Sequence, residues 1–416
     1  MAGDRGRVHC CIAGGGPAGM MLGLLLARAG VSVLVLEKHA DFLRDFRGDT
    51  IHPSTLEVMH ELGLLDSLLR LPHQEVRELT AQIGDVAVPI ADFTHLPTRC
   101  RFLAFMPQWD FLDFLARQAA RYPTFRLQMQ AEVTGLLEES GRVAGVQAVS
   151  RNGPIAIRAD LVVAADGRHS AVREKAGLPV TELGAPMDVL WFRLPRAPDD
   201  TGQTMGRFEL GQIFIMINRG EYWQCGYVIP KGQFDEIRAA GLESFRQRVA
   251  RLAPFAKGQA GELRAWDDVK LLTVQVDRVS RWYRPGLLCI GDAAHAMSPI
   301  GGVGINLAIQ DAVAAANVLA ASLCERRVTV HHLHQVQRRR QLPTRLTQRI
   351  QVVIQNRVIK SVLGSTRPLK PPLALRLIGI IPLLRRIPAW LVGIGIRPEH
   401  VKSPVAPVAT VDRCRS

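Results

Sequence analysis

The chain has 416 residues, of which 47% are hydrophobic and 22% are charged, a composition that is typical of a folded protein and excludes a disordered one. The length is sufficient for two domains with a sizeable core, and no uncharged apolar run reaches the ~18 residues of a membrane-spanning helix. The seven cysteines form no Cys-x-x-Cys pair, which argues against a zinc ribbon, predicts no metal site and favours reduced thiols in the cytoplasm. The N-terminus shows no signal peptide pattern.

The net charge of +14 is confined to the C-terminal region. Residues 326–416 contain 18 Lys and Arg but only Glu399 and Asp412 as acids, which gives +16 for this region and about −2 for residues 1–325. The main body of the protein therefore lacks the basic character that is typical of nucleic-acid binding.

A glycine-rich turn follows the first predicted strand, at residues 8–13. Gly14, Gly16 and Gly19 give the pattern G-x-G-x-x-G and lead into a helix predicted for residues 17–29. These glycines allow a tight turn, the approach of a pyrophosphate to the backbone and close packing of helix on strand, while the helix N-terminus attracts phosphate groups. The pattern predicts a site for an adenine dinucleotide, and the alternative is a glycine-rich turn in an ordinary α/β fold.

A second strand, predicted for residues 31–36, ends in Glu37. An acidic side chain at this position can accept hydrogen bonds from the 2′-hydroxyl of a ribose, and it would repel the 2′-phosphate of NADP. We therefore include Glu37 and its neighbour Lys38 among the predicted cofactor-binding residues.

Two later strands also end next to an acidic residue. Residues 161–165 precede Asp166 and Gly167, and residues 287–290 precede Asp292 by one position. Ligands of open parallel sheets bind beyond the carboxyl ends of the strands, so both carboxylates are candidate ligand contacts. A plain strand-to-helix turn is the alternative for Asp166 and Gly167.

A loop rich in glycine follows Asp292 and leads to a long alanine-rich helix that begins at Asn306. Its backbone N–H groups can face a polar heteroaromatic ring. His295, in the same stretch, is interpreted as a loop histidine without a catalytic role. The loop contains Pro299, Gly301, Gly302 and Gly304.

These motifs, in this order, resemble the group A flavoprotein monooxygenases, the family of para-hydroxybenzoate hydroxylase and the ubiquinone-biosynthesis hydroxylases, over about residues 8–325. The resemblance implies that the dinucleotide is FAD, with the glycine turn on its pyrophosphate, Glu37 on the adenosine ribose and Asp292 on the ribityl chain. It also implies that Asp166 serves both FAD and NAD(P)H, and that the loop at 301–306 lies against the flavin ring.

Further residues match the family individually. Arg47 matches an arginine that contacts FAD, and Gln108 matches a glutamine near the ribityl chain and the phosphates. Pro299 matches a proline whose backbone lies beside the substrate, and His52, shortly after Arg47, is a second candidate catalytic residue. The alternatives are a solvated arginine, a glutamine at a helix start and a histidine without a role.

The chain contains one dinucleotide fingerprint and no redox-active cysteine pair, so two-fingerprint flavoproteins and disulfide reductases are poor matches. By the resemblance, NADH or NADPH reduces the FAD and leaves, and O2 then forms a flavin C4a-hydroperoxide that transfers one oxygen atom to an electron-rich carbon. This predicts an FAD-dependent, NAD(P)H-consuming monooxygenase that hydroxylates an aromatic or polycyclic small molecule. The alternative is a flavin-dependent reductase or dehydrogenase on the same scaffold, similar to the polyprenyl reductases.

Residues 179–280 alternate apolar and polar positions, which predicts an antiparallel sheet that supplies a substrate wall. Alternation does not tell which face of each strand meets the substrate. Residues 225–230 read C-x-Y-x-I-P and lack both tryptophans of the W-x-W-x-I-P motif of flavin-dependent halogenases, which counts against halogenation. The candidate substrate residues are Trp191, Arg193, Phe208, Tyr222, Trp223 and Tyr227.

The basic C-terminal region is predicted to be helical at residues 330–363, where Leu346, Ile350 and Val353 recur at helical spacing and Gln355 lies on another face. Beyond it, prolines divide an apolar, arginine-rich stretch into pieces too short to span a bilayer. One interpretation is a helical pair that caps the FAD domain. The other is peripheral contact with the inner face of an anionic membrane, which would give access to lipophilic substrates.

Together these features predict an α/β protein with three parts. A Rossmann-like FAD-binding domain with a mixed or parallel sheet is formed by residues 1–178 and 281–325. An antiparallel-sheet substrate domain occupies residues 179–280, and a basic helical tail occupies residues 326–416.

Overall fold

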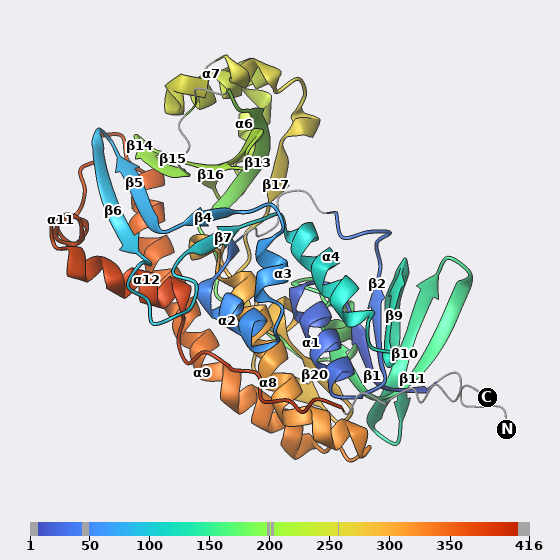
Figure 1. Ribbon diagram of the computed structural model, residues 1–416. Coiled ribbons are helices and arrows are strands. Elements are labelled where there is room, and N and C mark those ends of the chain that lie inside the picture. Colours follow the sequence, from blue (N-terminus) through green and yellow to red (C-terminus); the bar gives the residue numbers. More distant parts are fainter. Residues whose placement is uncertain (1–6, 44–49, 198–199, 201–203, 257, 407–416) are drawn as a thin grey trace, which may run out of the picture.

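The computed structural model of the chain describes residues 7–43, 50–197, 200, 204–256 and 258–406. The larger of its two main sheets has the eight strands β1 (Arg7–Ala13), β2 (Val33–Glu37), β8 (Phe125–Met129), β9 (Ala131–Glu139), β10 (Arg142–Ser150), β11 (Gly153–Ala164), β19 (Tyr283–Arg284) and β20 (Leu287–Cys289). Five of them, in the order β20-β11-β1-β2-β8, are parallel neighbours. β9, β10 and β19 join in antiparallel fashion, so the sheet is mixed, as predicted (Figure 1).

Three helices pack on one another beside this sheet: α1 (Pro17–Arg28), α4 (Gln108–Ala119) and α8 (Gly304–Cys324). Residues 18–27 of α1 are all buried, because the helix lies between the sheet and its two helical neighbours. The stretch Ile300–Cys324 has the length and hydropathy of a membrane-spanning helix, but 72% of its apolar window is buried inside the protein. Its apolar composition is therefore that of a core helix.

The second main sheet has seven strands in the order β17 (Lys270–Leu272), β13 (Met187–Pro195), β16 (Tyr222–Pro230), β15 (Gln212–Asn218), β14 (Met205–Glu209), β5 (Glu78–Ile83) and β6 (Val86–Asp92). Its neighbours pair antiparallel except β14 and β5, which are parallel. Because β5 and β6 come from the N-terminal part of the chain, residues 179–280 do not build this sheet alone. α6 (Phe234–Ala239) and α7 (Leu242–Leu252) cover one of its faces (Figure 1).

Smaller elements connect the two sheets. They are the strands β3 (Thr50–Ile51), β4 (Gln74–Val76), β7 (Leu103–Phe105), β12 (Val180–Glu182) and β18 (Asp277–Val279), the helices α2 (Pro53–Glu61), α3 (Leu65–Leu69) and α5 (Ala171–Lys175), and the 3-10 turns η1 (Pro254–Ala256), η2 (Gln259–Glu262), η3 (Trp266–Asp268), η4 (Gly291–Ala293) and η5 (Ile300–Gly302).

The basic C-terminal region contacts both sheet systems. α9 (Val330–Ile354) packs on α8 and continues through the π-helical turn η6 (Gln355–Ile359) into α10 (Lys360–Leu363). α11 (Leu373–Ile380), the turn η7 (Pro382–Arg385) and α12 (Arg386–Gly393) lie along β6 (Figure 1). The chain then returns to the first domain, where Ala406 N donates to Arg28 O at 2.9 Å.

Candidate cofactor site

The carboxyl ends of four parallel strands meet at one edge of the first sheet. The strand registers place Ala13 level with Ala164 and Leu36, and Ala164 level with Cys289. The residues at or just after these four strand ends therefore gather at the same edge, where an open parallel sheet binds ligands. They are the turn that begins at Gly14, together with Glu37, Asp166 and Asp292.

The three glycines of the first turn have different surroundings. Gly14 has a φ of +103°, and a Cβ there would lie 2.4 Å from Ala165 O. A Cβ on Gly19 would lie 2.0 Å from Gly14 O, so this glycine is needed to bring α1 against the strand. A Cβ on Gly16 would meet no atom within 4 Å. No side chain caps the N-terminus of α1, so the open space beside Gly16 and the first N–H groups of the helix fit a pyrophosphate.

Glu37 is buried, and its carboxylate stabilises this turn through hydrogen bonds with the backbone. Its Oε2 accepts a hydrogen bond from Gly15 N at 2.8 Å, and its Oε1 accepts one from His39 N at 3.1 Å. A carboxylate oxygen can accept more than one hydrogen bond, so the carboxylate is chemically suited to a ribose hydroxyl. Lys38, directly after it, is exposed.

Asp166 carries an acceptor atom that the protein does not use. Its Oδ2 accepts from Val172 N at 3.2 Å, whereas its buried Oδ1 has no hydrogen-bond partner among the described residues. Burial raises the pKa of Asp166, although hydrogen bonds from Ser170 and Val172 oppose the shift. A buried polar atom without a partner costs free energy, and a ligand hydroxyl that donates to Oδ1 would remove this cost. A Cβ on the neighbouring Gly167 would meet no atom within 4 Å, so there is free space beside this turn.

Asp292 stands at the end of β20 and is accessible. Its side chain is 33% exposed, and its Oδ2 lies 3.6 Å from a guanidinium nitrogen of Arg168. Gln108 is the first residue of α4, and Arg47 lies outside the described residues. The open glycine turn, the unused Asp166 oxygen and the accessible Asp292 carboxylate together fit the phosphates and hydroxyls of FAD.

His52, the N-cap residue of α2, contacts the loop at residues 298–304, here called the flavin loop because the resemblance predicts that it faces the flavin ring. The buried His52 has its Nδ1 at 2.6 Å from Val392 O and its Nε2 at 3.0 Å from Gly302 O. Burial lowers the pKa of His52, and the two carbonyl contacts oppose this only in part. Thr55 Oγ1 donates to Asn306 Oδ1 at 2.6 Å. Because both ring nitrogens face backbone carbonyls, the geometry favours a structural role for His52 over proton transfer.

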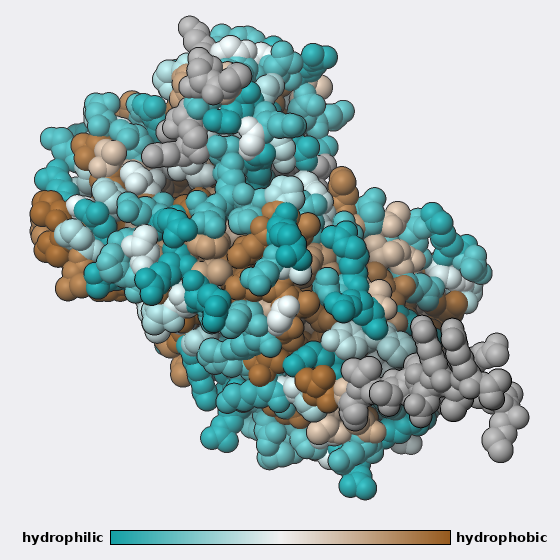
Figure 2. All heavy atoms as spheres, viewed as in Figure 1, coloured by the Kyte–Doolittle hydropathy of each residue, from teal (hydrophilic) through white to brown (hydrophobic). Residues whose placement is uncertain are grey.

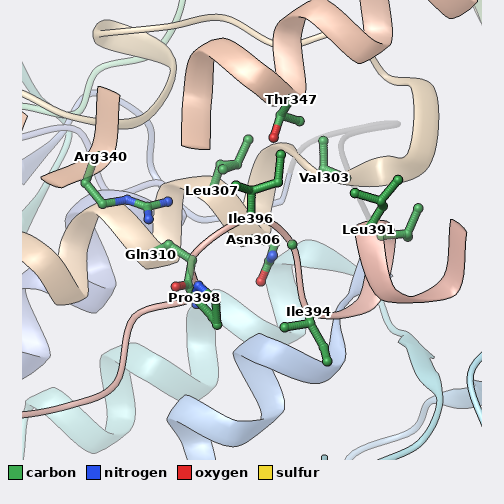
Figure 3. Close-up of a pocket in the computed structure, with 12 residues that line it drawn as sticks. Val303, Asn306, Leu307, Gln310, Arg340, Thr347, Leu391, Ile394, Ile396 and Pro398 are labelled. Atoms are coloured by element: carbon green, nitrogen blue, oxygen red, sulfur yellow. The ribbon is translucent and has the colours of Figure 1, made fainter. Parts of the chain in front are cut away.

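A small pocket lies beside the start of α8 (Figure 3). Asn306, Gln310 and Arg340 line it from α8 and α9, and the segment from Leu391 to Pro398 closes the other side. The C-terminal region therefore forms part of the surroundings of the flavin loop. Pro299 and Gly301 of this loop are partly or fully exposed.

The second sheet distributes the predicted substrate residues over two faces. Trp223 and Tyr227 are buried in a cluster with Phe245, on the face that α6 and α7 cover. Trp191 and Phe208 are partly buried and pack against the same cluster as Ile300 of the flavin loop. Trp191 and Phe208 therefore lie on the face of the sheet that meets the flavin loop and remain candidate substrate residues. Trp223 and Tyr227 lie on the opposite face, toward α7.

Arg193 and Tyr222, the other two predicted substrate residues, lie on the same face of the sheet as Trp191. The guanidinium of Arg193 sits 5.0 Å from the ring centroid of Tyr222. Arg193 follows Trp191 by two positions in β13, and alternate residues of a strand share a face.

One set of buried polar residues escaped prediction from the sequence, and two of them, Gln351 and Gln355, contact the flavin loop. α9 turns polar side chains inward, whereas the apolar residues predicted at helical spacing point outward: Ile350 is 39% exposed and Val353 is 51% exposed. The buried polar residues of α9 and η6 recur every three or four positions, which in retrospect is the only sequence signal for them. They are Gln337, Arg340, Thr344, Gln348, Gln351 and Gln355.

Parallel central strands, an open glycine turn and carboxylates at neighbouring strand ends are typical of a dinucleotide-binding fold. The chain belongs to the FAD binding domain family, whose match extends over residues 7–350. It is an FAD-dependent monooxygenase with NAD(P)H and O2 as cosubstrates, and the resemblance to the aromatic hydroxylases is confirmed.

Three relatives illustrate the similarity. The chain is 33% identical over 389 residues to 6-methylpretetramide 4-monooxygenase of Streptomyces rimosus, and the match covers 92% of this chain and 93% of that protein. It is 27% identical over 319 residues to 12-dehydrotetracycline 5-monooxygenase/anhydrotetracycline 6-monooxygenase of the same species, covering 74% of this chain but only 61% of that longer protein. The solved structure of the Streptomyces rimosus anhydrotetracycline hydroxylase OxyS has the same fold, with a TM-score of 0.72, 22% identity and coverage of 93% and 76% of the two chains.

Proposed function

We propose that this monooxygenase hydroxylates a phenolic ring of a tetracyclic, polyketide-like substrate. The observation that carries the proposal is the extent of the similarity to 6-methylpretetramide 4-monooxygenase, which covers 92% of this chain. The match therefore includes most of the second sheet and the C-terminal region, and is not confined to the nucleotide-binding part. None of the relatives described above is a reductase, so they do not support the reductase alternative.

The described residues divide the work of binding the cofactor. The turn at Gly14 and the N-terminus of α1 would hold the pyrophosphate, and Glu37 and Asp292 would accept hydrogen bonds from sugar hydroxyls. Asp166 Oδ1 would accept a hydrogen bond from one more hydroxyl of the nucleotide. When bound, FAD would take up electrons from NAD(P)H and activate O2. The protein would position the cofactor and the substrate and exclude water.

The substrate would lie between the flavin loop and the inner face of the second sheet. Trp191, Phe208 and Ile300 pack against one apolar cluster on this side of the sheet, which makes the two aromatic side chains the candidates for the substrate wall. Flat aromatic side chains favour offset stacking with a fused ring system, and their apolar surface removes water from around the reacting carbon.

The test is NAD(P)H oxidation by the FAD-loaded protein in air and under nitrogen, with a tetracyclic phenol such as 6-methylpretetramide and with a single-ring phenol. We expect the tetracyclic compound to accelerate NAD(P)H oxidation and to gain one oxygen atom only in air. A stronger response to the single-ring phenol would refute the substrate class, and full turnover under nitrogen would refute oxygenation.

We also propose that the surface formed by α11, η7 and α12, here called the apolar ledge, contacts an anionic membrane surface. Leu375 of α11 packs toward β5 and β6, but Leu373 is 72% exposed and Ile380 is 75% exposed. Figure 2 shows hydrophobic surface gathered over these elements, at the left edge of the view. The other exposed large apolar residues of the ledge are Leu377, Ile381, Leu383, Ile387 and Trp390.

The positive charge of this region favours an anionic partner. The exposed cations on and beside the apolar ledge include Arg367, Lys370, Arg376 and Arg386, and residues 326–398 contain no acidic residue. A surface that combines large apolar side chains with Lys and Arg suits anionic lipid headgroups.

Co-sedimentation with vesicles tests this contact. We expect binding to vesicles with phosphatidylglycerol, weaker binding to pure phosphatidylcholine, and loss of binding in the double variant Leu373→Ser and Ile380→Ser. The matched control is Leu43→Ser, because Leu43 is an exposed leucine of the FAD domain. Equal vesicle binding by the wild type and the double variant would overturn the membrane assignment. So would a wild type that forms dimers as its concentration rises but does not bind vesicles.

A further inference from the structure

α9 and η6 present an unusual polar stripe to the protein interior. The side chains of Gln337, Gln348, Gln351 and Gln355 are all nearly completely buried, together with those of Arg340 and Thr344 between them. Helices of globular proteins usually turn an apolar stripe inward, so six inward-facing polar residues need partners of their own. Most of these partners are backbone atoms of residues 277–300.

The end of the stripe nearest the flavin loop is the most densely bonded. Gln351 Oε1 accepts from Ser298 N at 3.2 Å, and its Nε2 donates to Ser298 O at 3.0 Å and to Ile300 O at 2.9 Å. Gln355 Nε2 donates to Ser298 Oγ at 2.7 Å. Gln348 Nε2 donates to Ala296 O at 3.1 Å. These three amides hold the chain on both sides of Ser298.

The far end of the stripe makes the same type of contact away from the flavin loop. Gln337 Oε1 accepts from Trp282 N at 3.0 Å, and its Nε2 donates to Ser280 O at 2.8 Å. Gln337 is therefore an internal reference for the loss of one buried glutamine in the same helix.

The flavin loop depends on such outside support. Between Ile290 and Val303 the chain forms only the short turns η4 and η5, so sheet or helix bonds satisfy few of its backbone groups. Buried backbone groups need partners, and the amide of Gln351 offers a donor and an acceptor at fixed separation. This two-sided contact fixes the position and the orientation of Ser298 relative to α9.

We propose that Gln351 and Gln355 are positioning residues that set the flavin loop against the ring of the bound cofactor. They touch neither cofactor nor substrate in this role; they determine where Pro299 and the following N–H groups stand. The inference rests on the proposed cofactor site and adds that α9, in the C-terminal region, controls its geometry.

The test compares Gln351→Met, Gln355→Met and Gln337→Met, each of which removes an amide and keeps the side-chain length. The readouts are the affinity for FAD, the visible absorption spectrum of bound FAD, and the fraction of NAD(P)H oxidation that ends as hydrogen peroxide. We expect Gln351→Met to bind FAD about tenfold more weakly, to shift the spectrum and to raise the peroxide fraction, because small displacements of a positioned group have large effects.

The controls separate positioning from stability. Gln337→Met is expected to lower the melting temperature but to keep the wild-type spectrum and peroxide fraction. Gln355→Met loses a single bond to a side chain, so it is expected to be less destabilised than Gln351→Met and to show a smaller spectral shift in the same direction. Equal spectra in all three variants, or equal changes in Gln337→Met and Gln351→Met, would overturn the proposal. Failure of the wild type to bind FAD would instead refute the cofactor site itself.

Discussion

Replacement of Arg340 by methionine is expected to destabilise the protein through one buried carboxylate. Asp311, in the middle of α8, accepts hydrogen bonds from Gly291 N at 3.0 Å, His295 Nε2 at 2.6 Å and Arg340 Nε at 3.0 Å. Asp311, His295 and Arg340 are each at most 1% exposed. Arg340→Met keeps most of the side-chain volume but leaves Asp311 without its permanent cation.

The magnitude follows from the cost of an uncompensated buried charge. Breaking a buried ion pair by removing one partner costs roughly 3–5 kcal/mol. An unfolding entropy of about 2.1 cal/mol/K per residue, applied to 416 residues, converts this cost into a melting temperature lower by about 3–6 °C. Glu399, which lies 3.9 Å from Arg340, keeps its closer partner Arg339 at 2.7 Å, so the main loss falls on Asp311.

The pH dependence identifies the group responsible. Burial raises the pKa of Asp311, but His295 and Arg340 outweigh burial and hold the pKa below its usual value. A depressed pKa stabilises the folded state above the unfolded pKa, and this stabilisation is lost as the pH falls. Removal of Arg340 takes away one of the two groups that lower the pKa of Asp311, so this pKa rises and the stability difference between variant and wild type is expected to shrink as the pH falls toward about 4.

Thermal unfolding of the apoprotein at several pH values is the assay. Arg338→Met is the matched control, because Arg338 is exposed on the same helix and its loss is expected to change stability by less than about 0.5 kcal/mol. Equal melting temperatures for the two variants, or a deficit of Arg340→Met that does not change with pH, would refute the reasoning.

Three further predictions concern the cofactor and substrate regions. Gly16→Ala should leave the apoprotein melting temperature unchanged but weaken FAD binding, whereas Gly19→Ala should impair both, since its Cβ would lie 2.0 Å from Gly14 O; equal FAD affinities of Gly16→Ala and wild type in a fluorescence titration would contradict this. Asp166→Asn should raise the melting temperature of the apoprotein near neutral pH, because burial raises the pKa of Asp166 and its negative charge is unfavourable above that pKa. The same variant should bind FAD more weakly, and a lower melting temperature of the apoprotein would count against this reasoning. Trp191→Ala should raise the KM for substrate with little loss of stability, whereas Trp223→Ala should cost about 3–5 kcal/mol of stability without a specific change in KM; the reverse pattern in steady-state kinetics and unfolding would reject the assignment of faces.

The strand ends that form the cofactor site could be predicted because their signals are local. A strand, a glycine turn and a helix follow one another within residues 8–29, and Glu37, Asp166 and Asp292 each stand at or just after an apolar strand. The parallel order of the strands then brings them together without any further information from the sequence.

The composition of the second sheet depends on long-range pairing and escaped prediction. The parallel pairing of β5 with β14 joins Ala81 to Gly206 across more than a hundred residues. Alternation predicts that a segment is a strand but does not name its partner, nor does it tell which of two buried faces meets a helix. The separation of Trp191 from Trp223 was therefore visible only in the structure.

The helix over residues 330–363 could be predicted, but its buried face could not, for a physical reason. Hydropathy assigns apolar residues to the interior, but Gln351 and its neighbours are buried because backbone groups of residues 277–300 need partners. The apolar Ile350 and Val353 are left outside, on a helix that also exposes arginines.

The tie between α9 and the flavin loop has a consequence for biosynthesis. A ribosome releases residues 298–304 well before residues 348–355, so the nascent chain carries the loop for some time without the amides that fix it. If Gln351 and Gln355 position this loop as proposed, FAD loading is expected to follow the release of α9 from the ribosome, and a chain truncated inside α9 is expected to bind FAD poorly.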